Sequence, residues 1–185
     1  ADAVLDEIAR IHSGYARGVY IKLLAGIGHL SGAQVALAIG LVDGIDSDYE
    51  KRNALGALGS AQPFDAEQEQ LVVAQARKIG SDFERAELLT GLLPSLAPDP
   101  SLRTAWLAAA NGIGSDFEHR RTLTALLAAH EVDDATLASV IDASTTIGSD
   151  FERRSLLVDA VGRVRDAERI AVAYAAASAQ IGSDF

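Results

Sequence analysis

The pentapeptide "IGSDF" occupies residues 79–83, directly before a run of helix-forming residues. It recurs, unchanged or in related form, at 11–15, 45–49, 113–117, 147–151 and 181–185. The six leading isoleucines follow one another at a constant interval of 34 residues, without insertion or deletion. A fixed period of this length is typical of stacked repeats, in which each unit buries one face against its neighbours. The pentapeptide therefore predicts a tandem array.

The pentapeptide itself has the pattern of a turn between two helices. Gly80 suits the left-handed residue that follows a helix C-terminus, and Ser81 suits the N-cap of the next helix. Glu84 completes a capping box with Ser81, and we expect the aromatic between them to pack inward. The equivalent structural cap residues are Gly114 and Gly148 for the glycine, and Ser47, Ser115 and Ser149 for the serine.

A second helix start lies in the other half of each repeat. Ser31, Asp65, Asp99 and Asp133 share one register and each precedes a helix-forming run, while Asp166 stands one residue early. Each repeat is therefore predicted to be a helix-turn-helix unit. We expect one all-α array over 1–185, with units starting at 11, 45, 79, 113, 147 and 181 and with partial units at 1–10 and 181–185. Because both ends cut across a repeat, two explanations stay open: the chain is a piece of a longer protein, or its ends stack head to tail on other copies.

The composition of the chain argues against several classes of function. The 185 residues include no cysteine and no methionine, so thiol chemistry is absent. A net charge of −10 repels phosphate backbones and argues against a nucleic-acid partner. No apolar run approaches the ~20 residues of a membrane span, so direct membrane insertion is not expected.

The repeat resembles known families in length and in its motif. Two helices in 34 residues is the arrangement of the tetratricopeptide repeat, although the Trp, Leu-Gly and Tyr pattern of that family is not followed here. The chain is more similar to a HEAT-like or TPR-like α-solenoid of its own kind, and this resemblance implies a right-handed superhelix. The segments "SDYEKR" and "SDFEHRR" also resemble repeats in the tails of bacterial BlaR-type membrane metallopeptidases. That resemblance implies a soluble accessory segment, and the zinc motif of the peptidase is missing.

No residue pattern indicates a catalytic group, a metal site or a cofactor. The repeated serines occupy six equivalent caps, which is not how one nucleophile is positioned, and the four histidines lack ligand spacing. The repeated aspartates form a row that we interpret as helix-dipole partners rather than calcium ligands, because helices ~8–10 Å apart keep adjacent carboxylates from sharing an ion. The members of that row are Asp48, Asp82, Asp116, Asp150 and Asp184.

Two surfaces are candidates for binding a partner. One is a basic row after the turn, which either pairs with neighbouring acids or holds an acidic extended peptide; its members are Arg52, Arg85, Arg120, Arg121, Arg153 and Arg154. The other lies on a first helix around Gln70, Arg77, Arg103 and Trp106, although core packing is the competing interpretation for Trp106. The predicted function is a non-catalytic helical-repeat module that binds a protein or peptide, and the chain is not predicted to be an enzyme. The alternative is a structural spacer or an array that self-associates end to end.

Overall fold

The computed structural model describes residues 1–129 and 132–182. Within these ranges the chain forms α-helices and two short 3₁₀ helices, with no strand, so the all-α class is confirmed. The helices are α1 (Asp2–Ala9), α2 (Gly14–Ile27), α3 (Gly32–Leu41), η1 (Val42–Gly44), α4 (Asp48–Ala61), α5 (Ala66–Ala76), α6 (Asp82–Leu92), η2 (Leu93–Ser95), α7 (Pro100–Ala110), α8 (Asp116–Ala129), α9 (Asp134–Ser144), α10 (Asp150–Val161) and α11 (Ala167–Ser178). His130 and residues 183–185 of the last repeat lie outside the described residues.

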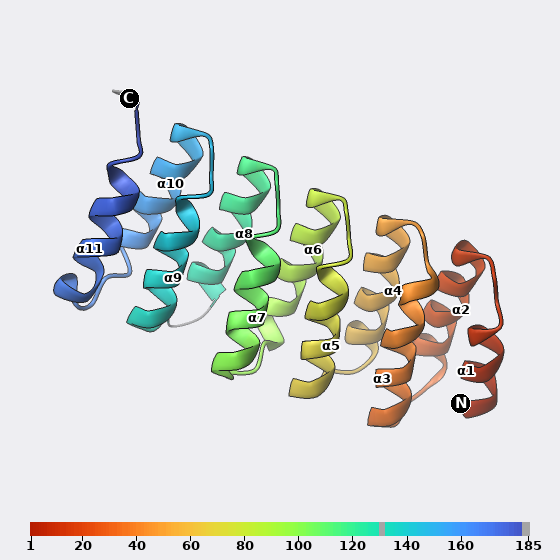
Figure 1. The fold of residues 1–185 in the computed structure, drawn as a ribbon. Coiled ribbons are helices and arrows are strands. Elements are labelled where there is room, and N and C mark those ends of the chain that lie inside the picture. The colour runs from red at the N-terminus through yellow and green to blue at the C-terminus, as the bar shows by residue number, and fades with distance from the viewer. Residues whose placement is uncertain (130–131, 183–185) are drawn as a thin grey trace. The chain divides into compact units, whose positions relative to one another are not determined.

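The chain divides into two compact units, residues 1–109 and residues 110–185. In the first unit α1, α3 and α5 pack in sequence against one another, and α2, α4 and α6 do the same (Figure 1). In the second unit α8 packs on α10 and α9 packs on α11. Each unit is thus built of two layers of helices. We call the odd-numbered helices A helices and the even-numbered helices B helices.

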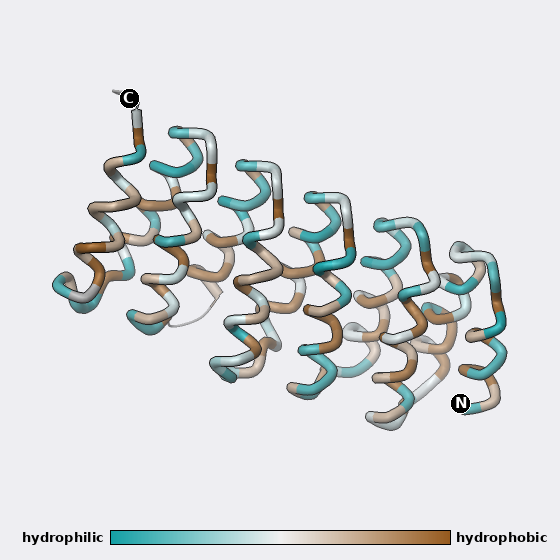
Figure 2. Tube along the Cα trace, viewed as in Figure 1, coloured by the Kyte–Doolittle hydropathy of each residue, from teal (hydrophilic) through white to brown (hydrophobic). Residues whose placement is uncertain are grey.

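The core of each unit lies between its two layers. In the first unit Ile39 and Val73 of the A helices and Leu55 and Leu89 of the B helices are almost fully buried. Figure 2 shows hydrophobic positions recurring along the helices of both layers, with hydrophilic positions at many helix ends. Each such buried side chain contributes about 1.5–3 kcal/mol when it leaves water. The repeated apolar positions therefore hold each unit together.

The turn between an A helix and a B helix differs from the sequence prediction in one respect. The serine side chains do cap the B helices, since Ser81 Oγ accepts the N–H of Glu84 at 3.4 Å and Ser47 Oγ that of Glu50 at 3.3 Å. The expected left-handed glycine is not found, because neither Gly80 nor Gly148 has a φ in the left-handed region. Instead, a Cβ at Gly80 would lie 3.4 Å from the carboxylate of Asp48. At Gly148 the corresponding distance to Asp116 is 3.3 Å, so a Cβ at either glycine would lie in contact with the aspartate of the neighbouring repeat.

Candidate functional site

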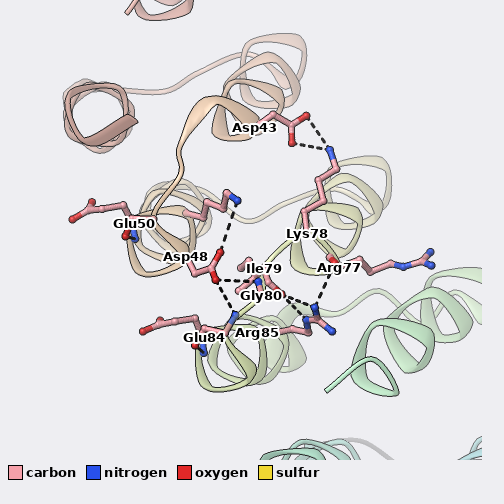
Figure 3. A network of polar contacts seen from close by, with 12 residues as sticks. Asp43, Asp48, Glu50, Arg77, Lys78, Ile79, Gly80, Glu84 and Arg85 are labelled. Carbon is pink, nitrogen blue, oxygen red and sulfur yellow. Dashed lines mark hydrogen bonds and ion pairs between the residues drawn. The ribbon is translucent and has the colours of Figure 1, made fainter. Parts of the chain in front are cut away.

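In several turns the aspartate of the motif binds the turn of the next repeat. Asp48 Oδ2 accepts the backbone N–H groups of Gly80 at 3.0 Å and Ser81 at 2.8 Å (Figure 3). In the second unit Asp116 accepts the N–H groups of Gly148 and Ser149, both at 2.8 Å. We call this arrangement the aspartate clasp. It also corrects the predicted capping box, because the N–H of Ser81 is directed to Asp48 and not to Glu84.

The glutamate after the aromatic pairs with a basic residue of the preceding repeat. Lys22 Nζ lies 2.7 Å from Glu50 Oε2, and Arg52 binds the Glu84 carboxylate in the same way. In the second unit Arg120 Nε donates to Glu152 Oε2 at 2.6 Å. The guanidinium of Arg120 also lies over the ring of Phe117, as that of Arg52 does over Tyr49. These two arginines are therefore already paired with carboxylates and rings of the chain.

Another set of basic side chains closes the ends of A helices. Arg85 Nε donates to the carbonyl of Ile79 at 3.0 Å. Arg153 is buried and donates to the carbonyls of Ser144 and Ile147. Helix C-terminal carbonyls lack partners within the helix and favour a cation. Arg85 and Arg153 thus stabilise turns.

The predicted partner-binding residues are found in different environments. Trp106 is fully buried, and its Nε1 donates to the carbonyl of Leu89 at 3.0 Å, so it belongs to the core and not to a surface. Gln70 is exposed on α5, Arg77 is exposed at the C-cap of that helix, and Arg103 is half-buried on α7. In the basic row Arg154 is exposed and Arg153 is buried, while the half-buried members are Arg52, Arg85, Arg120 and Arg121. Arg121 pairs within its own helix with Glu118 at 2.7 Å.

The aromatic of the motif is exposed, contrary to the sequence prediction. In the first unit Tyr15, Tyr49 and Phe83 and in the second Phe117 and Phe151 are between 51% and 70% exposed. We call these residues the aromatic row of each unit. The aromatic is the second residue of its B helix, so positions four and seven residues later share its face.

The sequence carried a signal for this exposure that the prediction missed. After Phe83 the positions on the same face hold Glu87 and Thr90, which are polar. A helical face that continues with polar residues is a solvent face. The aromatic row therefore contributes little to the core.

A groove runs between α4 and α6 on the outer side of the B layer. It is a cavity of about 270 Å³, with Leu55, Leu88 and Leu92 among its apolar residues and Phe64 beside them. Its lining further includes Arg52, Gly56, Gly59, Ser60, Glu87, Gly91 and Ser95. A Cβ built on Gly56 or on Gly91 would meet no atom within 4 Å. Because glycine inside a helix costs about 0.5–1 kcal/mol relative to alanine, these two glycines lower stability without a packing reason.

The equivalent positions of the second unit carry side chains instead of glycines. Two repeats after Gly56 and Gly91 the chain has Thr124 and Asp159. Thr124 Oγ1 on α8 donates to Asp159 Oδ2 on α10 at 3.0 Å. The fold therefore accepts side chains at both places, and the open groove is a property of the α4 and α6 pair.

One buried carboxylate lies in the first unit. Glu69 of α5 is fully buried, and its Oε2 accepts the N–H of Ala97 at 2.9 Å. Its other oxygen, Oε1, has no hydrogen-bond partner. Burial raises the pKa of Glu69, an effect that the hydrogen bond from Ala97 partly offsets. The side chain holds the proline-rich segment that follows η2.

The described residues contain neither a group of three or more metal-binding side chains nor a helix able to cross a membrane. No protein-family model, curated protein or solved structure matches this chain. The arrangement of exposed rings and an open groove on B helices suits recognition of another molecule through apolar contact.

Proposed function

We propose that the chain is a non-catalytic α-solenoid that binds a protein or peptide along the outer face of its B helices. One observation carries this proposal: the aromatic row is exposed in every described repeat. The other repeated residues of the motif have contacts within the chain, since the aspartate forms the clasp, the serine caps the helix and the glutamate pairs with a base. The rings of Tyr49 and Phe117 lie under the guanidinium groups of Arg52 and Arg120, yet all five aromatic residues stay more than half exposed, so their contacts within the chain leave ring surface open to a partner. Aromatic side chains are frequent anchors of protein interfaces because they bury much area at little entropic cost.

The charge pattern favours partners that are not acidic. The predicted acidic peptide needs guanidinium groups that are open to a ligand, whereas Arg52 and Arg120 bind Glu84 and Glu152. The net charge of −10 further repels an acidic partner. The proposal therefore rests on aromatic and apolar contact with a neutral or basic segment.

A selection experiment tests this function. A displayed library of random peptides is enriched on the wild-type chain and on a variant with Tyr15→Ser, Tyr49→Ser and Phe83→Ser. We expect the wild type to enrich peptides that the variant does not bind, with unchanged thermal unfolding. A matched control replaces Leu37 and Leu71, which are exposed on A helices, by serine and should keep binding. Equal binding by the row variant, or no enrichment on the wild type, contradicts the proposal.

A second candidate function, end-to-end self-association, is favoured by a different observation. Val4 and Tyr20 are 46% and 51% exposed at one end of the first unit, whereas their repeat equivalents Val72 and Leu88 are buried. Ala3, Ile8 and Ile11 line a cavity beside them. A further helix pair of the same kind fits this apolar face. Sedimentation of the wild type and of Tyr20→Lys over a range of concentrations tests it: self-association that Tyr20→Lys abolishes supports this function, and a monomer at all concentrations contradicts it.

A further inference from the structure

We propose that the groove between α4 and α6 is the specificity site of this module and that it receives the apolar face of a basic amphipathic helix from a partner protein. The inference rests on the proposed binding function and assigns one part of the molecule to it. The groove is lined by B-helix residues on both sides, among them Leu55 and Leu88, with Gly56 and Gly91 at its open side.

The two glycines leave room that the fold does not need. A Cβ at Gly56 or at Gly91 would contact nothing, and the α8 and α10 pair has Thr124 and Asp159 at the same places. Side chains at these positions are therefore compatible with the repeat. Small residues on a helix surface let another helix approach closely. The two glycines keep the outer side of this one helix pair accessible.

The size of the groove fits two apolar side chains of a helix. A cavity of ~150 Å³ already holds a benzene ring, and this groove has about 270 Å³. Its lining on α4 runs from Arg52 to Ser60, which corresponds to roughly 12 Å or two helical turns. Two large side chains spaced three or four residues apart on a helix meet both dimensions.

The charge and the surroundings of the groove select a basic helix. At the N-terminal end of the groove Arg52 is bound to Glu84 and lies over Tyr49, so its charge is compensated. The chain as a whole carries a net charge of −10, which attracts lysine and arginine flanks on the occupant. Because Arg52 lines the groove and lies over Tyr49, the groove borders the aromatic row at this ring, and we expect one partner helix to contact both.

Labelled model peptides test the inference directly. The probe is a helical peptide of about 16 residues with leucines on one face and lysines on the other. A second peptide has glutamates in place of the lysines, and a third has a central proline that breaks the helix. Binding to the full chain is measured by fluorescence anisotropy at low and high salt. We expect the basic helix to bind, and the acidic and broken peptides to bind at least about tenfold more weakly.

Two double variants test whether the peptide binds in the groove. Gly56→Thr with Gly91→Asp copies the side chains of α8 and α10 into the groove and should weaken binding of the basic helix about tenfold or more. Because a new aspartate alone changes charge, Gly56→Leu with Gly91→Leu fills the groove without charge and should have the same effect. The matched control, Thr124→Ala with Asp159→Ala, alters the equivalent positions of the second unit and should leave the affinity within about twofold.

Several results of these binding experiments would contradict the groove assignment. Unchanged binding in both filled variants, or tighter binding of the acidic or broken peptide, overturns the groove assignment. If binding depends on the aromatic row but not on the groove, the proposed function stands and this inference fails. If the wild type binds none of the helical peptides while library selection still succeeds through the row, the occupant is not a helix and the inference also fails.

Discussion

The α4 and α6 pair of the first unit and the α8 and α10 pair of the second follow the same plan but differ on their outer side. Both pairs have the aspartate clasp, an arginine bound to the glutamate of the next repeat, and a guanidinium over an exposed ring. They differ where Gly56 and Gly91 correspond to Thr124 and Asp159. The clasp and the ion pair that join repeats are thus kept in both pairs, while the outer positions hold glycines in one pair and a hydrogen-bonded Thr124 and Asp159 in the other.

This difference separates two roles of repeated residues. A residue that contacts the next repeat is constrained by that contact, and Asp48 and Asp116 accordingly have equivalent partners. A residue on the outer side is limited only by solvent and by any bound partner. Of the two pairs compared, only the α4 and α6 pair has open glycines at these outer positions, although Gly26 of α2 and Gly40 of α3 also have space for a Cβ.

The largest change in the free energy of unfolding should come from removing the aspartate of the clasp in either pair. Asp48→Ala or Asp116→Ala leaves two backbone N–H groups without their charged acceptor and should lower the free energy of unfolding by about 2 kcal/mol. Urea unfolding followed by the fluorescence of Trp106, the single tryptophan, measures the first variant. Hydrogen exchange of the Gly148 and Ser149 amides measures the second. Asp46→Ala, at an exposed aspartate of the same turn, is the control. If the two variants lose different amounts of free energy of unfolding, the two clasps are not equivalent.

The next effect should be a gain of stability from the groove glycines. Gly56→Ala with Gly91→Ala should raise the free energy of unfolding by about 1–2 kcal/mol, because both sites are helical and have space for a Cβ. Removing the hydrogen bond of the other pair by Thr124→Ala and Asp159→Ala should lower it by no more than about 1 kcal/mol. Chemical denaturation of both variants gives the two values. A loss of stability in the alanine pair would show that the glycines serve the fold.

A third test uses pH to compare the A helices of the two pairs. Glu69 on α5 corresponds to Leu137 on α9, and both are fully buried. Because the folded pKa of Glu69 is raised above its ordinary 4.5, the protonated form is favoured in the folded state. The stability that neutral Glu69 contributes is fully present at pH values below the pKa of this group in the unfolded state. It is lost as the pH rises through the pKa of the group in the folded state.

The measurement compares the wild type with Glu69→Gln. As pH falls from about 7 to about 4, the free energy of unfolding of the wild type should rise relative to that of the variant. Urea denaturation at several pH values gives this difference. A difference that is constant across the range would mean that burial does not hold the carboxyl in its neutral form.

The smallest effect should come from the aromatic row. Phe83→Ser and Phe117→Ser should each change the free energy of unfolding by less than about 1 kcal/mol, because the rings are half exposed. The buried Leu89, replaced by alanine, should cost about 2–5 kcal/mol in the same assay. A large loss at either ring would assign the row to the core and weaken the proposed function.

The repeat and its helix starts were predictable because they depend on local chemistry. Ser81, Asp65 and Asp133 each cap the helix that follows them, since a side-chain oxygen reaches the N–H three residues away in any context. The inward aromatic and the left-handed glycine were wrong for one reason. Both were assigned from the turn alone, whereas Phe83 is placed by the polar face of its helix and Gly80 by Asp48 of another repeat.

The candidate site was less predictable than the fold. The basic row was identified from its residues, but its pairing with Glu84 and Glu152 depends on helices that are one repeat apart. The groove was not predicted, although Gly56 and Gly91 are visible in the sequence as glycines inside helical runs. Whether such a glycine faces a neighbour or solvent depends on how the helices pack.

By itself the sequence determined the period, the two helices of each repeat and the caps that start them, because each follows from contacts within a few residues. Only the tertiary structure decided which face of each helix, in both layers, meets a neighbour. That choice buries Trp106, exposes the aromatic row and opens the groove between α4 and α6, since it depends on the packing of helices a whole repeat apart.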